Sequence, residues 1–190
     1  MQEVEVFYPK SVADWRKWLE KNHLSKQSVW LVFYTKSSKR KSITWSDAVD
    51  VALCFGWIDS KKIRIDEETS HQFFSRRKAR STWSKINKEK VQRLIDNGLM
   101  TEAGLQSIEM AKKNGSWTIL DIVEELKIPK DLEQAFKKKQ GSKDYFQSLS
   151  KSARKGMLQW LVLAKRPETR QKRIDEIATL ASQKKKPKQF

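Results

Sequence analysis

Strand-forming sequence is confined to the part of this chain that precedes about Pro129. From there onward only helical patterns are found, over residues 130–139, 143–149, 152–165 and 168–183, with breaks at Gly141 and Pro167. A chain with this order of elements is expected to be α+β, with its sheet in one domain and helices in the next. We therefore predict an α+β domain over residues 1–128, an all-helical domain over 129–183 and a disordered basic tail over 184–190.

Within the first domain, short β-branched and aromatic runs alternate with helical patterns. Residues 28–35 read SVWLVFYT and predict a central strand, while residues 4–8 predict a shorter one. Residues 57–65 and 71–76 predict an antiparallel hairpin around an acidic turn. Capping residues before apolar stripes predict further helices over 11–22, 84–96 and 101–113 and from Thr44 to Gly56. The expected sheet is small, mixed and largely antiparallel, and helices pack on it.

The net charge of +17 on 190 residues is the main compositional clue to a partner. The charge is +6 before Pro129 and +11 from Pro129 onward, so the smaller part is the more cationic. Such an excess is typical of proteins that meet nucleic acid, an anionic membrane surface or acidic ligands. Charge alone does not choose among these partners.

The compartment is inferred from cysteine usage and from apolar runs. Cys54 is the only cysteine, which excludes an internal disulfide, and residues 1–15 lack the features of a signal peptide. The longest apolar stretches, such as 29–33 and 49–55, are far shorter than the roughly 20 residues that span a bilayer. We expect a cytoplasmic protein without a transmembrane segment.

The segment from Gly56 to Trp83 mixes aromatic and cationic residues more densely than the rest of the chain. It reads GWIDSKKIRIDEETSHQFFSRRKARSTW, and the overlapping span 76–93 holds eight cations and one acid. Guanidinium groups beside exposed rings bind phosphates, carboxylates or stacked bases. We predict an anion site here, and its candidate ligand-binding residues are Trp57, Asp59, Arg64, Arg76, Arg77, Arg80 and Trp83.

A structural interpretation of the same segment stays open at this point. Arg76 could pair with Asp59 or Asp66 across the hairpin, and Trp83 could fill the core. The two-residue alternation of a regular strand would place Asp59 and Lys61 on one face. Such a pair is more often a salt bridge than a proton-transfer device.

The eight tryptophans divide by position into two groups. Five occupy apolar positions of helices or strands and are expected in the core, namely Trp15, Trp18, Trp30, Trp45 and Trp160. Three flank turns and are the ones expected to face solvent, namely Trp57, Trp83 and Trp117.

A second basic cluster lies at the start of the last predicted helix. Its members are Lys165, Arg166, Arg170 and Arg173. Cations at a helix N-terminus oppose the helix dipole, so this cluster is a second candidate for an anionic partner.

Catalytic, metal and cofactor motifs are not found in the sequence. Cys54 is expected to be buried and unreactive. His23 and His71 are the only histidines, and neither has metal-ligand spacing around it. We predict no catalytic residue, no metal and no cofactor.

Three motifs together resemble one protein family. They are LCFGWIDS at residues 53–60, FFSRRKARSTWSKIN at 73–87 and LAKRPETRQKRI at 163–174. In this order they look like the YdeI/OmpD-associated family, also called bacteriocin-protection proteins, with its helical C-terminal domain. The resemblance carries over to Trp57, Asp59, Arg76, Arg77, Arg80, Trp83, Lys165, Arg166, Pro167, Glu168, Arg170 and Arg173. Ser75 departs from the pattern, which implies a less rigid loop, and the family implies no reaction or cofactor.

Three functions compete for this sequence. The first is a non-enzymatic cytoplasmic protein that binds an anionic small molecule or an acidic protein partner, with a role in envelope stress or bacteriocin protection implied by the resemblance. The second is nucleic-acid binding, although the sequence shows no aromatic RNA-binding sheet signature. The third is an enzyme that acts on an anionic small molecule through Asp59 and an arginine.

Overall fold

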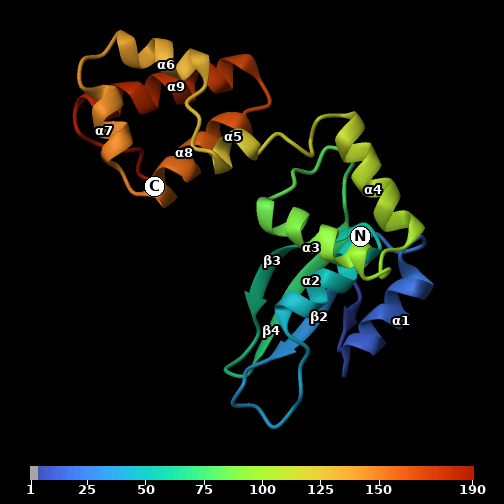
Figure 1. Cartoon of the computed structure of the whole chain (residues 1–190). Coiled ribbons are helices and arrows are strands. Elements are labelled where there is room, and N and C mark those ends of the chain that lie inside the picture. Colours follow the sequence, from blue (N-terminus) through green and yellow to red (C-terminus); the bar gives the residue numbers. More distant parts are fainter. Residues whose placement is uncertain (1–3) are drawn as a thin grey trace. The chain divides into compact units, whose positions relative to one another are not determined.

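The computed structural model describes residues 4–190 and divides the chain after Trp117. The first unit contains β1 (Val6–Phe7), α1 (Val12–Asn22), β2 (Ser28–Tyr34), α2 (Trp45–Cys54), β3 (Trp57–Arg64), β4 (Thr69–Arg76), α3 (Lys85–Asp96) and α4 (Glu102–Lys113). The second contains α5 (Asp121–Glu124), α6 (Lys130–Lys137), α7 (Ser142–Ser148), α8 (Lys151–Val162) and α9 (Pro167–Ser182) (Figure 1). The predicted fold class is confirmed.

The four strands form one mixed sheet in the order β1-β2-β4-β3. β1 runs parallel to β2, while β2 and β3 both pair antiparallel with β4. β2 is therefore an interior strand, and the acidic residues 66–68 form the turn of the β3–β4 hairpin, both as predicted.

Capping side chains fix where the helices of this unit begin. Ser11, Thr44, Ser84 and Thr101 each accept a hydrogen bond from the backbone N–H three residues later. Each such cap stabilises its helix by about 1 kcal/mol.

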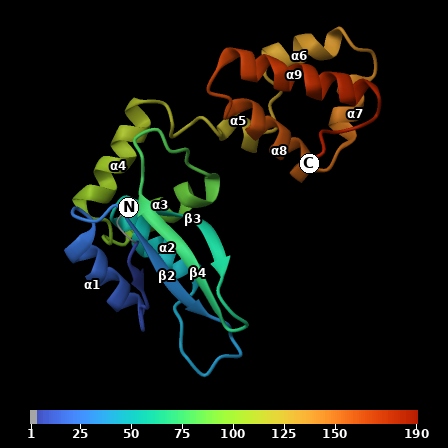
Figure 2. The same cartoon turned by 180° about the vertical axis from the view of Figure 1, so that it is seen from behind.

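The helices of the first unit cover one face of the sheet. Figure 2, seen from behind, looks onto β2 and β4 with α2 beyond them. The buried core lies on the helix side, where Val29, Leu31 and Phe33 of β2 pack with Phe74 of β4 and with the apolar stripe of α2. The alternate residues of the same strands point to the opposite face.

The second unit has a core of its own, built only from helices and the segment that follows them. Leu132, Phe146, Leu158 and Ile177 are each at most 1% exposed within it. The predicted boundary at 128/129 falls inside this unit, because α5 was not foreseen and buries Val123 in the second core.

The segment 184–190 departs from the disordered tail that the sequence predicts. Its last residue, Phe190, packs against Trp160 with ring centroids 5.8 Å apart and belongs to the second apolar cluster. Pro187 is also buried. A terminal aromatic ring that finds an apolar site offsets the entropy of ordering the segment.

Within residues 4–190, no helix is both long and apolar enough to cross a membrane.

Candidate functional site

The two tryptophans that bracket the predicted site are sealed in the core. Trp57 is 0% exposed and Trp83 is 1% exposed, so the prediction that they face solvent is wrong. Gly56 explains the burial of Trp57, since its φ of 70° reverses the chain after α2 and directs Trp57 inward. The Trp57 indole then packs edge-on against Trp18, with centroids 5.8 Å apart.

Arg76 caps a helix instead of pairing with a carboxylate. Its Nε donates to the carbonyl oxygen of His23 at 2.6 Å, and its Nη2 donates to that of Leu24. Both carbonyls lie at the C-terminal end of α1, where backbone oxygens have no partner within the helix and carry the negative end of its dipole. The positive charge of Arg76 therefore stabilises the end of α1, and these two hydrogen bonds occupy its Nε and Nη2.

Arg77 is held by an aromatic ring with little hydrogen bonding. Its guanidinium carbon lies 3.6 Å from the centroid of Trp83, and its Nη1 donates to the carbonyl oxygen of Thr82 at 3.1 Å. Its Nε and Nη2 are buried and have no hydrogen-bond partner among the described residues. Burial lowers the pKa of Arg77 to about 10, and the charge of Asp59 opposes this shift only in part.

A small cavity of about 270 Å³ lies beside these arginines. Arg76, Arg77 and Trp83 line it, together with residues of α4 such as Gln106 and Ser107. The structure therefore brings these three predicted residues together. The volume is slightly below the range of about 300–1,000 Å³ that is typical of small-molecule sites.

The other predicted residues of the central cluster lie elsewhere. Arg80 is exposed and does not line the small cavity. Arg64 is at the far end of β3, where its Nε donates to the carbonyl oxygen of Asp66 at 3.0 Å. Asp59 faces a second, larger cavity. The seven residues do not form one site.

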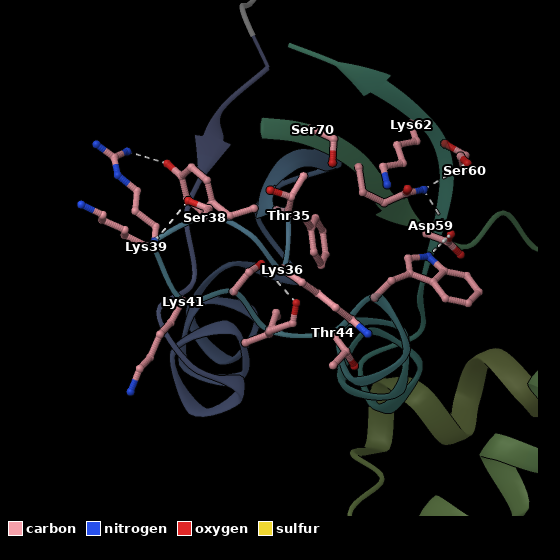
Figure 3. Close-up of a pocket in the computed structure, with 17 residues that line it drawn as sticks. Thr35, Lys36, Ser38, Lys39, Lys41, Thr44, Asp59, Ser60, Lys62 and Ser70 are labelled. Carbon is pink, nitrogen blue, oxygen red and sulfur yellow. Dashed lines mark hydrogen bonds between the residues drawn. The ribbon is translucent and has the colours of Figure 1, made fainter. Parts of the chain in front are cut away.

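The larger cavity has a volume of about 840 Å³ and lies between the loop after β2 and the helix-side face of β3 and β4 (Figure 3). Its lining includes five cations and one carboxylate, which are Lys36, Lys39, Arg40, Lys41, Lys62 and Asp59. Neutral polar groups, including Thr35, Thr44, Ser60, Ser70 and Gln72, complete the walls with Phe33, Tyr34 and Trp45. Its size is within the usual range for small-molecule sites.

A bulge in β3 decides which lysine enters this cavity. Asp59 pairs with Phe74 and Lys62 pairs with Gln72, so β3 has one residue more than β4 between these points. The extra residue shifts the alternation, and Lys62 shares the cavity face with Asp59. Lys61 instead lies over the rings of Trp30 and Phe73, so the predicted pairing of Asp59 with Lys61 on one face is wrong.

Asp59 fixes the orientation of an exposed indole. Its Oδ2 accepts a hydrogen bond from Trp45 Nε1 at 2.9 Å and another from Gln72 Nε2 at 3.1 Å. Trp45 is 52% exposed, so its predicted place in the core is wrong. It is the first residue of α2, directly after the Thr44 cap, where the helix face has not yet turned toward the sheet.

The lysines of the cavity wall differ in direction. In Figure 3, Lys36 reaches across the cavity from the loop and Lys62 points into it from β3, whereas Lys39 and Lys41 point away. Arg40 donates to the Tyr34 hydroxyl at 2.7 Å, and this hydrogen bond raises the pKa of Arg40. The sequence shows the loop as cationic, but only the fold shows that it faces Asp59.

Two members of the second basic cluster, Arg170 and Arg173, bind groups of neighbouring helices within the second unit. Arg170 binds both carboxylate oxygens of Asp131, at 2.6 and 3.1 Å, and lowers the pKa of that carboxyl. Arg170 also donates to the carbonyl oxygen of Leu161, and Arg173 donates to that of Trp160 at 2.5 Å. These carbonyls end α8, so the unfavourable position of the arginines on α9 is offset by a neighbouring helix terminus.

The remaining two members of that cluster, Lys165 and Arg166, are exposed. They lie in the connection between α8 and α9, with Arg166 as the residue that precedes the Pro167 start of α9.

Cys54 is buried against α4 and takes no part in either cavity. Burial raises the pKa of its thiol, which keeps the sulfur protonated at neutral pH. Among residues 4–190, no three histidine, cysteine or acidic side chains are grouped as metal ligands.

Two family models match the chain. Residues 7–107 match a domain of unknown function (DUF8412), and residues 125–184 match the family described as Bacteriocin-protection, YdeI or OmpD-Associated. Searches of curated proteins and of solved structures gave no significant match. The motif at 163–174 thus falls within the second match, whereas the motifs at 53–60 and 73–87 fall within the first.

Proposed function

Because the chain belongs to the bacteriocin-protection, YdeI or OmpD-associated family through its helical unit and carries a DUF8412 domain before it, we propose that it is a binding protein. Its first unit captures an anionic small molecule in the 840 Å³ cavity beside Asp59. Any protective role follows from this capture. The single observation that carries the proposal is that Lys36 and Lys62 reach the same space from opposite walls.

The charge balance of the cavity favours an anion. Two lysines, Lys36 and Lys62, point into it against one carboxylate, and that carboxylate already accepts two hydrogen bonds. Lysine ammonium groups bind phosphate and carboxylate oxygens as point charges, in any of several directions. An anion that enters between Lys36 and Lys62 would lower the repulsion between them.

The exposed Trp45 ring indicates a planar group next to that anion. The hydrogen bond to Asp59 holds the indole in place, so stacking on it costs little side-chain entropy. The rest of the wall offers hydroxyl and amide groups for orientation. We therefore expect a ligand with a ring and a phosphate or carboxylate, such as a nucleotide or an aromatic acid.

The test is a calorimetric and thermal-shift screen of nucleoside phosphates, sugar phosphates and aromatic carboxylic acids. A ligand that binds only the folded state raises the melting temperature. For a hit, Lys36→Gln and Lys62→Gln should each weaken binding about tenfold, the size expected when a charge-assisted hydrogen bond is lost.

Lys41→Gln is the matched control, because Lys41 lines the same cavity but points away from it. The affinity of the Lys41→Gln variant for the same ligand should stay within about twofold of the wild type. Binding that survives Lys36→Gln and Lys62→Gln but is lost in Arg77→Gln would reject this cavity and assign the ligand to the smaller one.

A further inference from the structure

The sheet of the first unit has a second face that none of the unit's helices covers. Strand alternation and register place the same set of residues on it throughout. They are Val6 on β1, Ser28, Trp30, Val32 and Tyr34 on β2, Thr69, His71, Phe73 and Ser75 on β4, and Lys61 and Ile63 on β3. Ile58, opposite Ser75 at the start of β3, packs against the first core and is left out of the set. We call this set the outer face.

Aromatic rings occupy the centre of the outer face. Trp30 and Phe73 are directly opposite each other, with centroids 4.8 Å apart and ring planes at 71°, and His71 lies 6.4 Å from Trp30. Val6 and Ile63, at the two edges, are 54% and 39% exposed. The solvent face of an antiparallel sheet is normally polar, so this apolar surface calls for an occupant.

The charge of the outer face selects an anionic occupant. Its strand positions include no aspartate or glutamate, while Lys61 places its Nζ 5.1 Å from the Trp30 ring centroid and 5.5 Å from that of Phe73. Arg64, further along the same edge strand, pairs with Ser70 and therefore lies on the helix-side face. A second copy of the chain stacked on this face would bring two Lys61 side chains together, on a protein of net charge +17.

The hairpin turn at one end of the outer-face strands is acidic, and two of its three carboxylates are engaged there. Asp66 accepts from the backbone N–H groups of Glu68 and Thr69, and Glu68 accepts from the Ser38 hydroxyl. The turn limits the anion-binding surface at one end of the strands. Glu5, whose carbonyl oxygen accepts from the Trp30 backbone N–H, directs its carboxylate to Trp18 Nε1 and to Lys26.

We propose that the outer face binds single-stranded nucleic acid. Bases stack on Trp30 and Phe73, and a phosphate contacts Lys61. Paired aromatic residues beside lysines on an open sheet are suited to unstacked bases, because every base offers a flat face and each linkage adds one negative charge. The sequence alone hides this arrangement, since Trp30 and Phe73 are 43 positions apart and meet only through the β2–β4 register.

The test is fluorescence anisotropy with a labelled oligodeoxythymidylate of about 15 nucleotides, near the upper end of single-domain site sizes. Trp30→Leu and Phe73→Leu keep an apolar side chain but remove the ring, and each should weaken binding about fivefold or more. Lys61→Gln should reduce the slope of log K against log salt by about 0.7. Circular dichroism checks that each variant is folded.

Lys36→Gln is the control, because its cavity lies on the helix side of the sheet; it should leave oligonucleotide binding within about twofold. This design also separates the present proposal from the small-molecule site, since each set of variants affects one ligand only. Absence of binding at low salt would overturn the proposal. So would equal affinity for duplex and single strand with no effect of Phe73→Leu, or a wild-type dimer that Phe73→Leu converts to monomer.

Discussion

Arg77 shows how a partly buried cation is accommodated by an aromatic ring. Its guanidinium carbon lies 3.6 Å from the Trp83 ring centroid and its Nη1 donates one hydrogen bond, while within residues 4–190 its buried Nε and Nη2 have no hydrogen-bond partner. Each unsatisfied donor costs about 1–3 kcal/mol, which the cation–π contact offsets by about 2 kcal/mol. The same burial disfavours the charged guanidinium and lowers the pKa of Arg77 to about 10.

At the same scale, Asp131 predicts a pH effect on the helical unit. Hydrogen bonds from Arg170 and from the Leu132 backbone lower its pKa below the ordinary 3.8. A carboxyl with a lowered folded-state pKa stabilises the fold above pH 3.8, and this contribution is lost as the pH falls through the folded-state value. Asp131→Asn should therefore cost about 1 kcal/mol of unfolding free energy at pH 7, and less at pH 3.

Denaturant unfolding followed by circular dichroism at both pH values measures this difference. Asp144→Asn, an exposed carboxyl on α7, serves as the control. The same loss at pH 3 and pH 7 for Asp131→Asn would show that the ion pair does not carry the effect.

At the scale of elements, α4 is seated unusually close to the end of α2. A methyl group on Gly104 would lie 2.3 Å from the carbonyl oxygen of Cys54, which already accepts from the Thr101 backbone and hydroxyl. Gly104→Ala should therefore lower the unfolding free energy by about 1–3 kcal/mol, although alanine is the better helix former.

Chemical denaturation measures the Gly104 effect. Glu109→Ala is a suitable control, because it introduces alanine at an exposed position of the same helix and should change stability by less than about 0.5 kcal/mol. An unchanged stability for Gly104→Ala would mean that α4 can move away from α2 at no cost.

Local sequence signals were sufficient for the elements that carry their own caps and periodicity. The helices after Ser11, Thr44, Ser84 and Thr101 were predicted within one or two residues of their observed bounds. α5 was missed because its four residues are too few to show a helical period.

The candidate site was less predictable, since side-chain direction depends on tertiary geometry. The prediction reversed Trp45 and Trp57: a turn flank suggested exposure for Trp57, and an apolar stripe suggested burial for Trp45. The bulge after Asp59 exchanged the faces of Lys61 and Lys62, and no local residue pattern indicates such an insertion.

At the scale of the whole molecule, the two separate cores predict two separable unfolding reactions. Leu158 is 0% exposed in the second core, so Leu158→Ala should destabilise that unit by about 2–5 kcal/mol. Seven of the eight tryptophans precede Thr118, so fluorescence follows the first unit while circular dichroism follows both. The dichroism transition should become biphasic and the fluorescence midpoint should stay unchanged.

Leu19→Ala, in the first core, should lower the fluorescence midpoint and leave the dichroism transition of the second unit unchanged. Coincident fluorescence and dichroism transitions that shift together in Leu158→Ala would indicate a single cooperative system.

The extra residue in β3 lets two neighbouring lysines serve opposite sides of one sheet. In an unbulged strand paired onward from Asp59 in the same register, Lys61 would share the side of Asp59 and Lys62 would point away from it. Deleting Ser60 instead leaves Lys61 opposite Phe73 and Lys62 opposite Gln72, so each lysine keeps its present side. The division of labour between the two ammonium groups is therefore set by where pairing resumes after the irregularity, and it would survive a shortening of the strand.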